Sequence, residues 1–202
     1  MPAYLFDIGN VIIRFDFGLT IARLAPACDL PADEMRPAVA DLTRAFELGE
    51  MDTPAFLSQC AERLGYEGSL EDLEMAFADI FTLNQPIVDF IESRAQAGHP
   101  LFLLSNTNAI HVPFFTSTYP VFSHFHGATY SHLVGAMKPD SRIYEAAIAA
   151  HDLDPARTIY VDDLEANIVE GKAHGLQAIH YHHEAHERFL AEHDALLAQL
   201  SG

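Results

Sequence analysis

Short apolar runs alternate with longer amphipathic segments along most of this chain. Five runs have the composition of buried strands: Ala3–Ile8, Pro100–Leu104, Ala128–Tyr130, Thr158–Val161 and Gln177–Tyr181. Segments with helical spacing lie between most of these runs, which predicts crossover connections and therefore a parallel sheet. The pattern indicates an α/β fold with a doubly wound, Rossmann-like sheet.

The segment from residue 16 to residue 83 interrupts this alternation. We find no strand pattern there, whereas apolar residues recur at helical spacing, as in Met35, Val39, Leu42 and Phe46. Asn84-Gln85-Pro86 then marks the start of a helix that returns to the sheet. We therefore expect an all-helical cap, residues 16–83, inserted after the first strand of an α/β core formed by residues 1–15 and 84–202.

Three of the predicted strands end in polar residues. Asp7 closes the first run, Ser105-Asn106 follows the second, and Asp162-Asp163 follows the fourth. Ligands bind beyond the carboxyl ends of strands in open α/β sheets, so these residues are expected to share one crevice. Taken singly, each has an ordinary explanation, because aspartate and serine commonly cap helices or form turns.

The residue types in this crevice suit phosphate chemistry. Asp7 precedes Gly9 and can stand clear of other side chains, as an attacking carboxylate must. Carboxylates that converge repel one another unless a hard cation lies between them, and magnesium is the expected ion. Ser105 offers a hydroxyl and the backbone beside it offers N–H groups for phosphate oxygens. Lys138 could neutralise a phosphoryl group, although a solvated surface lysine is the simpler interpretation of that residue alone.

The composition of the chain limits the compartment and the classes of binding partner that we expect. Half of the 202 residues are apolar, which suits one core with a modest insertion. The 11 basic and 29 acidic side chains give a formal charge of −18. This charge disfavours nucleic acid and anionic membranes as partners, and no apolar segment approaches the ~20 residues that span a bilayer. With only Cys28 and Cys60 and no leader pattern after Met1, we expect a reduced, cytoplasmic protein.

The C-terminal region is rich in histidine. His182 or His183 could lie beside His186 on one helix face, as a metal site requires. We favour a solvated amphipathic helix that docks through apolar residues such as Phe189 and Leu190.

The order of four segments resembles the signature motifs of the haloacid dehalogenase-like hydrolase superfamily: Phe6-Asp7-Ile8-Gly9-Asn10, Ser105-Asn106-Thr107-Asn108, Lys138-Pro139 and Asp162-Asp163. The resemblance spans nearly the whole chain. The helical insert is similar to that of the small-cap subgroup, and the likeness is greatest to α-D-glucose-1-phosphate phosphatases. It implies a magnesium-dependent phosphatase that hydrolyses a small phosphorylated metabolite, plausibly a sugar phosphate such as glucose 1-phosphate, through an aspartyl-phosphate.

The resemblance also implies a role for each site residue. Asp7 would be the nucleophile. The phosphoryl group would be bound by Ser105, Asn106 and Lys138. Magnesium would be held by Asp7, the Gly9 carbonyl and Asp163. The site would be supported by Asp162 and Asn167.

The chain departs from the common family pattern at Gly9. Most phosphatases of the superfamily have a second aspartate there that acts as general acid and base, and glucose-1-phosphatase-like members share the gap. Proton transfer is thus left to a group of the cap, a water on magnesium, or His111.

Other classes of protein remain as alternatives. A hydrolytic 2-haloacid dehalogenase also attacks through an aspartate, but that subgroup has Tyr-Gly-Thr where this chain has Gly9-Asn10-Val11. A receiver-like domain has an acidic pocket with a lysine but normally lacks a large insert, and a catalytically inactive binding protein would explain Gly9. The sequence does not predict the oligomeric state.

Overall fold

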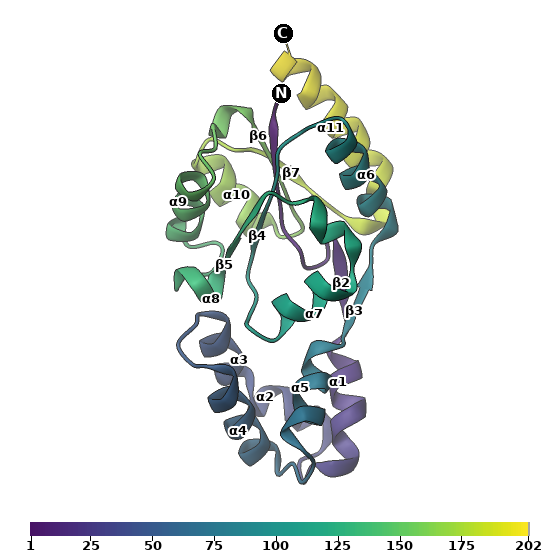
Figure 1. The fold of residues 1–202 in the computed structure, drawn as a ribbon, viewed down its shortest axis with the longest axis vertical. Coiled ribbons are helices and arrows are strands. Elements are labelled where there is room, and N and C mark those ends of the chain that lie inside the picture. The colour runs from purple at the N-terminus through teal and green to yellow at the C-terminus, as the bar shows by residue number, and fades with distance from the viewer. Residues whose placement is uncertain (202) are drawn as a thin grey trace.

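A five-stranded parallel sheet forms the centre of the larger half of the molecule in a computed structural model, which describes residues 1–201 (Figure 1). The strands are β1 (Ala3–Phe6), β4 (Leu101–Ser105), β5 (Gly127–Tyr130), β6 (Thr158–Asp162) and β7 (Gln177–His180), in the spatial order β5-β4-β1-β6-β7. These are the five predicted strands, and the doubly wound α/β fold is confirmed. β1 ends at Phe6 rather than Ile8, although the Asp7 N–H still bonds to the Val161 carbonyl at 2.9 Å.

Side chains alternate between the two faces of β1 and so fix which helices cover each face. Tyr4 and Phe6 pack with residues of three helices: α6 (Gln85–Gln96), α7 (His111–Thr118) and α11 (His186–Ser201). Leu5 packs on the opposite face with residues of α9 (Ser141–Ala150) and α10 (Glu165–Ala173). A short helix, α8 (Ser131–Val134), follows β5. Residues 1–201 also contain four short 3₁₀ segments: Ala25–Ala27, Pro120–His124, Pro155–Arg157 and His183–Ala185.

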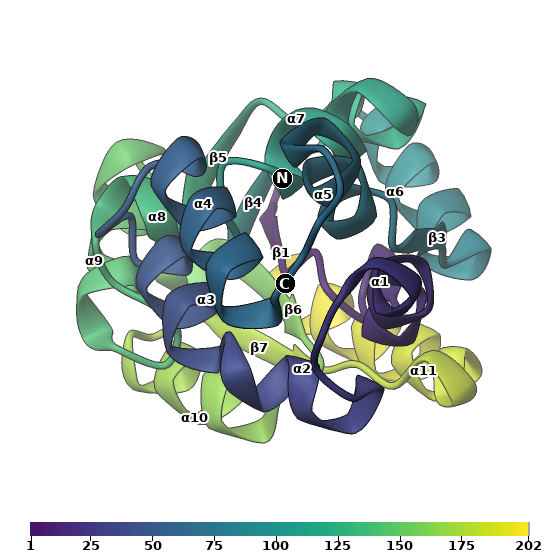
Figure 2. The same cartoon turned by 90° about the horizontal axis from the view of Figure 1, so that it is seen from below.

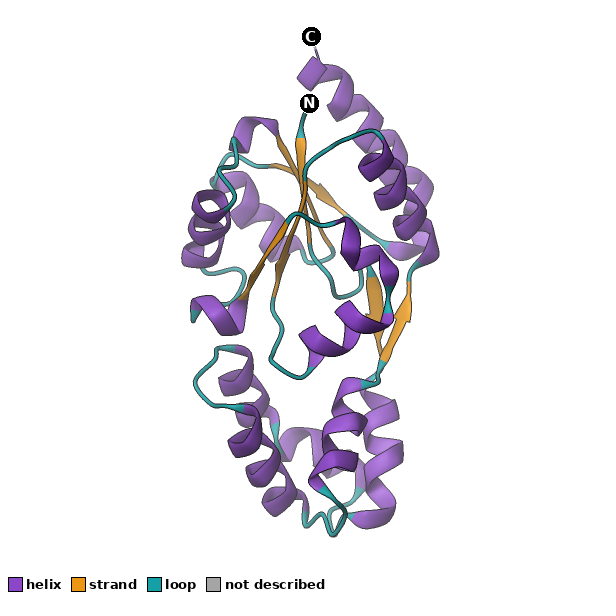
Figure 3. Cartoon of the chain, in the orientation of Figure 1, coloured by secondary structure: helices purple, strands orange, loops and turns teal. Residues whose placement is uncertain are grey.

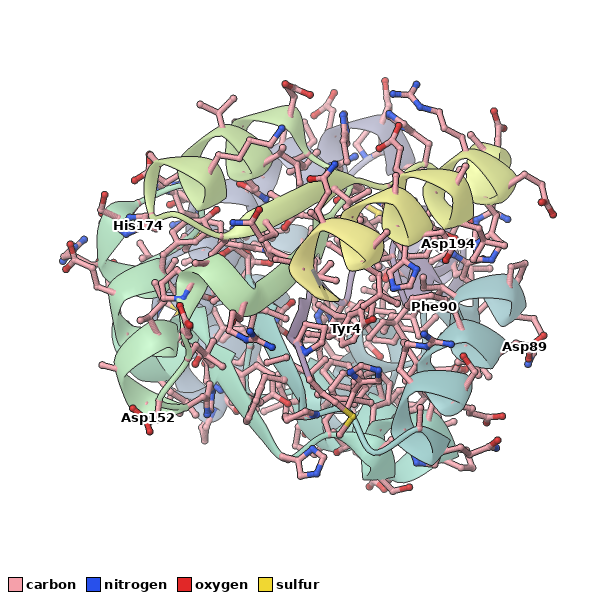
Figure 4. All side chains as sticks on the ribbon, turned by 90° about the horizontal axis from the view of Figure 1, so that it is seen from above. Tyr4, Asp89, Phe90, Asp152, His174 and Asp194 are labelled. Atoms are coloured by element: carbon pink, nitrogen blue, oxygen red, sulfur yellow. The ribbon has the colours of Figure 1, made fainter. Side chains whose placement is uncertain are left out.

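The C-terminal helix α11 docks on the sheet through aromatic contacts. Phe189 is buried, and its ring lies 4.9 Å from that of Phe90. His193 is also buried and its Nε2 is hydrogen-bonded to the Tyr4 hydroxyl at 2.7 Å. Figure 4 views this packing from the end opposite the cap, with Asp194 marking α11. The predicted docking through Phe189 therefore agrees with the structure, whereas His182 and His183 precede α11 and do not share its helix with His186.

A second, two-stranded antiparallel sheet connects the core to the helical insert (Figure 3). It consists of β2 (Ile13–Phe15) and β3 (Phe81–Leu83), and we call it the connecting ribbon. The expectation that residues 16–83 are all helical was therefore wrong at β3, whereas β2 lies just before that segment. Strands of three residues are too short to show a period of two, and these form because each pairs with the other.

Five helices form the insert between the two strands of the connecting ribbon. They are α1 (Phe17–Leu24), α2 (Ala32–Ala38), α3 (Ala40–Glu47), α4 (Thr53–Leu64) and α5 (Leu70–Ala78). Figure 2 looks along the molecule from this end and shows α3 and α4 on one side with α1 and α5 on the other. The helices share an apolar cluster in which the stacked rings of Phe46 and Phe56 lie 4.3 Å apart. We treat this helical body as the cap.

Candidate active site

The candidate site lies at the carboxyl edge of the three central strands. Asp7 follows β1, Ser105 ends β4, and Asp162 ends β6, with β1 paired to both neighbours. From β1 the chain goes to β4 on one side, and it later returns to β6 on the other. This reversal is the topological switch point at which such sheets bind ligands. The structure therefore brings the three polar strand ends together, as the sequence predicts.

Lys138 joins the site from the segment between α8 and α9. Its Nζ lies 2.7 Å from Asp7 Oδ1 and 2.6 Å from Asp162 Oδ2. Burial lowers the pKa of Lys138, but the charges of Asp162 and Asp7 outweigh burial and hold this pKa above its usual value. Lys138 is therefore a buried, permanent positive charge and not a solvated surface residue.

Asp162 is the fixed anionic partner of this lysine. Its Oδ2 also accepts a hydrogen bond from the Tyr160 hydroxyl at 2.5 Å, and its Oδ1 accepts from Asn167 Nδ2 and the Leu164 N–H, both at 2.9 Å. Burial raises the pKa of Asp162, but Lys138 and these donors reverse the effect, and the net shift is downward. Because both oxygens are engaged, Asp162 anchors Lys138, and Asn167 holds Asp162.

Neighbouring charges and hydrogen bonds offset the cost of burying Asp7 and Asp163 less completely than that of Asp162. Burial raises the pKa of Asp7 to about 7, because Lys138 offsets only part of the desolvation and Asp162 adds a second negative charge. Burial also raises the pKa of Asp163, although Asn10 Nδ2 donates a hydrogen bond to its Oδ2 at 3.1 Å. Asn10 has a φ of 54°, a left-handed conformation that asparagine tolerates better than most residues, and this turn aims its amide at Asp163.

The site fits a hard divalent cation. Carboxylate oxygens of Asp7, Asp162 and Asp163 lie within 4.8 Å of one another. When ionised, these three groups face one ammonium, so the local charge stays negative and a cation would relieve the repulsion. Asp162 is already saturated by hydrogen bonds, which leaves the carboxylates of Asp7 and Asp163 as the available side-chain ligands.

Ser105, which ends β4, and Asn106, which follows it, make different contacts. Ser105 is buried, and its Oγ makes only a long contact, 3.4 Å, with the Asn106 carbonyl. It is not a helix cap, because α7 begins at His111 and the Asn108 side chain accepts from that residue's N–H. Asn106 uses its side chain to fix Lys138: its Oδ1 accepts from the Lys138 N–H at 2.8 Å and its Nδ2 donates to the Lys138 carbonyl at 3.1 Å. These two hydrogen bonds fix the orientation of the Asn106 side chain beside Lys138.

His111 connects the core to the cap. Its Nε2 lies 3.1 Å from the Phe77 carbonyl and its Nδ1 lies 3.1 Å from Asn108 Nδ2. Burial lowers the pKa of His111 to about 4, so the ring is neutral near pH 7. A neutral ring that donates to Phe77 and accepts from Asn108 has no proton left to give to a substrate. His111 is therefore a structural link and not the missing general acid.

A cavity of about 520 Å³ extends from the site into the cap. Its core wall includes Asp7, Ser105, Lys138 and Asp163. Its cap wall is largely aromatic and aliphatic, and the polar side chains on that wall are Thr20, Arg36, Thr43 and Glu47. The cap therefore closes one side of the space into which the candidate nucleophile faces.

Ser131 fastens the cap to the core beside this cavity. Its buried Oγ accepts from the Thr107 N–H at 3.0 Å and also lies 3.0 Å from the Thr107 carbonyl and 2.6 Å from the Glu47 carbonyl. Gly49 approaches α8 so closely that a Cβ atom there would lie 2.0 Å from the His132 carbonyl oxygen. No sequence pattern singled out Ser131, because its importance comes from a contact between residues 84 positions apart.

A family model described as haloacid dehalogenase-like hydrolase matches residues 1–175 of the chain. The chain therefore belongs to the haloacid dehalogenase-like hydrolase family, as the resemblance of its motifs implies. Among residues 1–201, every helix is too short or too polar to span a bilayer.

One named relative and two solved structures are similar to this chain. D-ribitol-5-phosphate phosphatase from Bacteroides thetaiotaomicron is 25% identical over 182 residues, which cover 86% of this chain and 88% of the relative. A haloacid dehalogenase family enzyme from the same species, solved with magnesium and inorganic phosphate, superposes with a TM-score of 0.80 at 21% identity and covers 89% of this chain and 93% of its own. L-2-haloacid dehalogenase from Xanthobacter autotrophicus gives a TM-score of 0.64 at 14% identity, covering 89% and 77%. At these identities the two structures show a shared fold.

Proposed function

We propose that this protein is a magnesium-dependent phosphatase that hydrolyses a small phosphorylated metabolite through an aspartyl-phosphate on Asp7. The observation that carries the proposal is the position of Lys138 Nζ, 2.7 Å from Asp7 and 2.6 Å from Asp162, at the floor of a cavity that the cap closes. Phosphoryl transfer depends on positioning and on neutralising charge, and this arrangement supplies both next to a nucleophile.

Each residue of the site would have its own role in phosphoryl transfer. Asp7 would attack phosphorus, and Lys138 would neutralise the oxygens of the phosphoryl group that it receives. The Ser105 hydroxyl, which has only a long contact in the protein, would donate to one of these oxygens. Asp162 and Asn106 keep Lys138 in place by its ammonium and its main chain respectively.

Magnesium would be held by Asp7, the Gly9 carbonyl and Asp163. When bound, it would neutralise the carboxylates and polarise the phosphoryl group. The negative charge of the protein supports a requirement for magnesium. A phosphate dianion is repelled by a formal charge of −18 and by three carboxylates in the site, and a bound cation would reduce that repulsion.

We further propose a sugar or sugar-alcohol phosphate as the substrate. The name of the relative D-ribitol-5-phosphate phosphatase supports this class. Glucose 1-phosphate, suggested by the sequence resemblance, stays a candidate within it. The small phosphorylated partner and the cytoplasmic location likewise stay predictions.

A hydrolytic dehalogenase is the second candidate function, since a structure of that activity shares the fold. The experiment that separates the two measures phosphate release from 4-nitrophenyl phosphate, glucose 1-phosphate and ribitol 5-phosphate, with magnesium and with EDTA, and chloride release from 2-chloropropionate. We expect phosphate release that EDTA abolishes and no chloride release. Asp7→Asn should remove the activity. Chloride release without phosphate release would refute the proposal.

A further inference from the structure

The proposed reaction needs a proton for the departing oxygen, and the core offers none. Residue 9 is glycine, and His111 is neutral with both ring nitrogens hydrogen-bonded. The carboxyl groups that line the cavity are those of Asp7, Asp163 and Glu47. Asp7 is the candidate nucleophile and Asp163 a candidate metal ligand, which leaves Glu47 as the cap's one carboxyl group on the cavity wall.

Glu47 is held at the junction of cap and core. It ends α3, and its carbonyl accepts from Ser131 Oγ at 2.6 Å. The same hydroxyl is bonded to Thr107, two residues after Ser105. One buried serine thus ties the main chain of Glu47 to the loop that follows the candidate phosphate-binding residue. The close approach of Gly49 to α8 fixes the residues just after Glu47.

The carboxyl group of Glu47 is suited to hold and release a proton. It is half-buried, and among residues 1–201 no hydrogen bond or ion pair engages its side-chain oxygens. Burial raises the pKa of Glu47, and Arg44, three residues earlier on α3, opposes this only in part. The charged groups that line the same cavity are Arg36 of α2 and, from the core, Asp7, Lys138 and Asp163. A phosphate dianion entering this space would raise that pKa further, because it adds negative charge.

We propose that Glu47 is the general acid and base of this enzyme, in the place of the side chain absent at Gly9. This inference rests on the proposed phosphatase function. While an Asp7 oxygen bonds to phosphorus, the bond to the leaving oxygen breaks with its electron pair, and Glu47 gives that oxygen its proton. Glu47 then takes a proton from the water that attacks phosphorus, the bond from phosphorus to Asp7 breaks, and phosphate leaves.

The test is the dependence of the single-turnover rate on the leaving group, measured on the magnesium-loaded protein with esters from 2,4-dinitrophenyl to primary alkyl phosphates. Wild-type rates should depend weakly on leaving-group pKa. In Glu47→Gln the dependence should become steep, with alkyl esters losing about 10²–10⁴-fold and activated aryl esters losing less than about tenfold. Glu50→Gln, an exposed change three residues away, is the matched control and should follow the wild type.

Three outcomes would overturn the inference. A steep dependence in the wild-type protein would mean that no acid operates, whether or not the variant folds. An equal loss on every ester would show that Glu47 only stabilises the cap. A raised KM for sugar phosphates with an unchanged slope would show that Glu47 binds substrate hydroxyls. Absence of phosphate release from every ester by the wild type would instead refute the proposed function itself.

Discussion

The ring of Phe15 lies over Gly9, and a Cβ atom added at Gly9 would come within 3.0 Å of Phe15 Cε1. Phe15 belongs to the connecting ribbon and its side chain is partly exposed, so a side chain at residue 9 would have to push the ring slightly aside. The position of the Phe15 ring and the absence of a side chain at residue 9 therefore depend on each other.

This packing predicts coupling between the two residues. Gly9→Asp should destabilise the protein by about 0.5–1.5 kcal/mol, because the Phe15 ring must move off its preferred position to admit the new side chain. In the double variant with Phe15→Ala the loss should be smaller than the sum of the single losses by about 0.5–1.5 kcal/mol. Urea denaturation of the four proteins measures this coupling. Leu19→Ala, an exposed position on α1, is the control and should be additive with Gly9→Asp.

Asp7→Asn should remove turnover, and the stability of the metal-free variant relative to the wild type should rise with pH. The folded-state pKa of Asp7 is raised to about 7 from an ordinary value of 3.8. Between these values the folded protein binds more protons than the unfolded chain, so the wild type loses stability as pH rises. The stability of Asp7→Asn relative to the wild type should therefore rise from pH 4 to pH 7, by up to about 1.4 kcal/mol per pH unit, and then level off. Melting in EDTA at several pH values checks this; a constant difference would contradict it.

Lys138→Met should be strongly destabilising, although the side chain keeps its length. The change leaves Asp7 and Asp162 buried without their shared cation, and breaking a buried pair costs about 3–5 kcal/mol. Lys172→Met is the matched control, because it removes the chain's other lysine from an exposed position on α10 and should change stability by less than about 0.5 kcal/mol. Urea denaturation at pH 8 in EDTA compares them, and similar losses in the two variants would refute the role of Lys138.

Asp163→Asn should raise the magnesium concentration needed for half-maximal activity by about tenfold or more, since a hard-cation site loses a formal charge. Asp163 accepts only one side-chain hydrogen bond, from Asn10, so the fold should be retained. Asp33→Asn, exposed in the first turn of α2, supplies the control. Magnesium titrations of the rate on 4-nitrophenyl phosphate make the measurement. An unchanged midpoint would exclude Asp163 as a ligand.

The core of the fold could be predicted because its signals are local. Apolar runs such as Leu101–Leu104 mark buried strands, and polar residues directly after them mark the sheet edge. The connecting ribbon could not, because strands of three residues carry too little pattern. The order of the motifs placed Lys138 in the site, whereas its burial between Asp7 and Asp162 depends on partners that the local sequence does not show.

The parts of the site that depend on contacts between distant segments were missing from the sequence analysis. Phe15 over Gly9 requires the ribbon to fold back, and Ser131 gains its role only when α3 meets α8. The side chain of Asn106 turns to the Lys138 main chain, a choice that no spacing encodes. The order of the four motifs along the chain indicated the chemistry. Three-dimensional packing determines which side chains remain free to perform it.

The two segments that connect the core to the cap lie side by side in the connecting ribbon, where Ile13–Phe15 pairs with Phe81–Leu83. Two linkers joined by hydrogen bonds act as one hinge, so a rigid-body opening of the cap would be a rotation about the ribbon rather than a sliding motion. Phe15 lies on that hinge. The rotation that admits a substrate would then also shift the ring above Gly9, and entry to the site and the shape of its floor would change in a single movement.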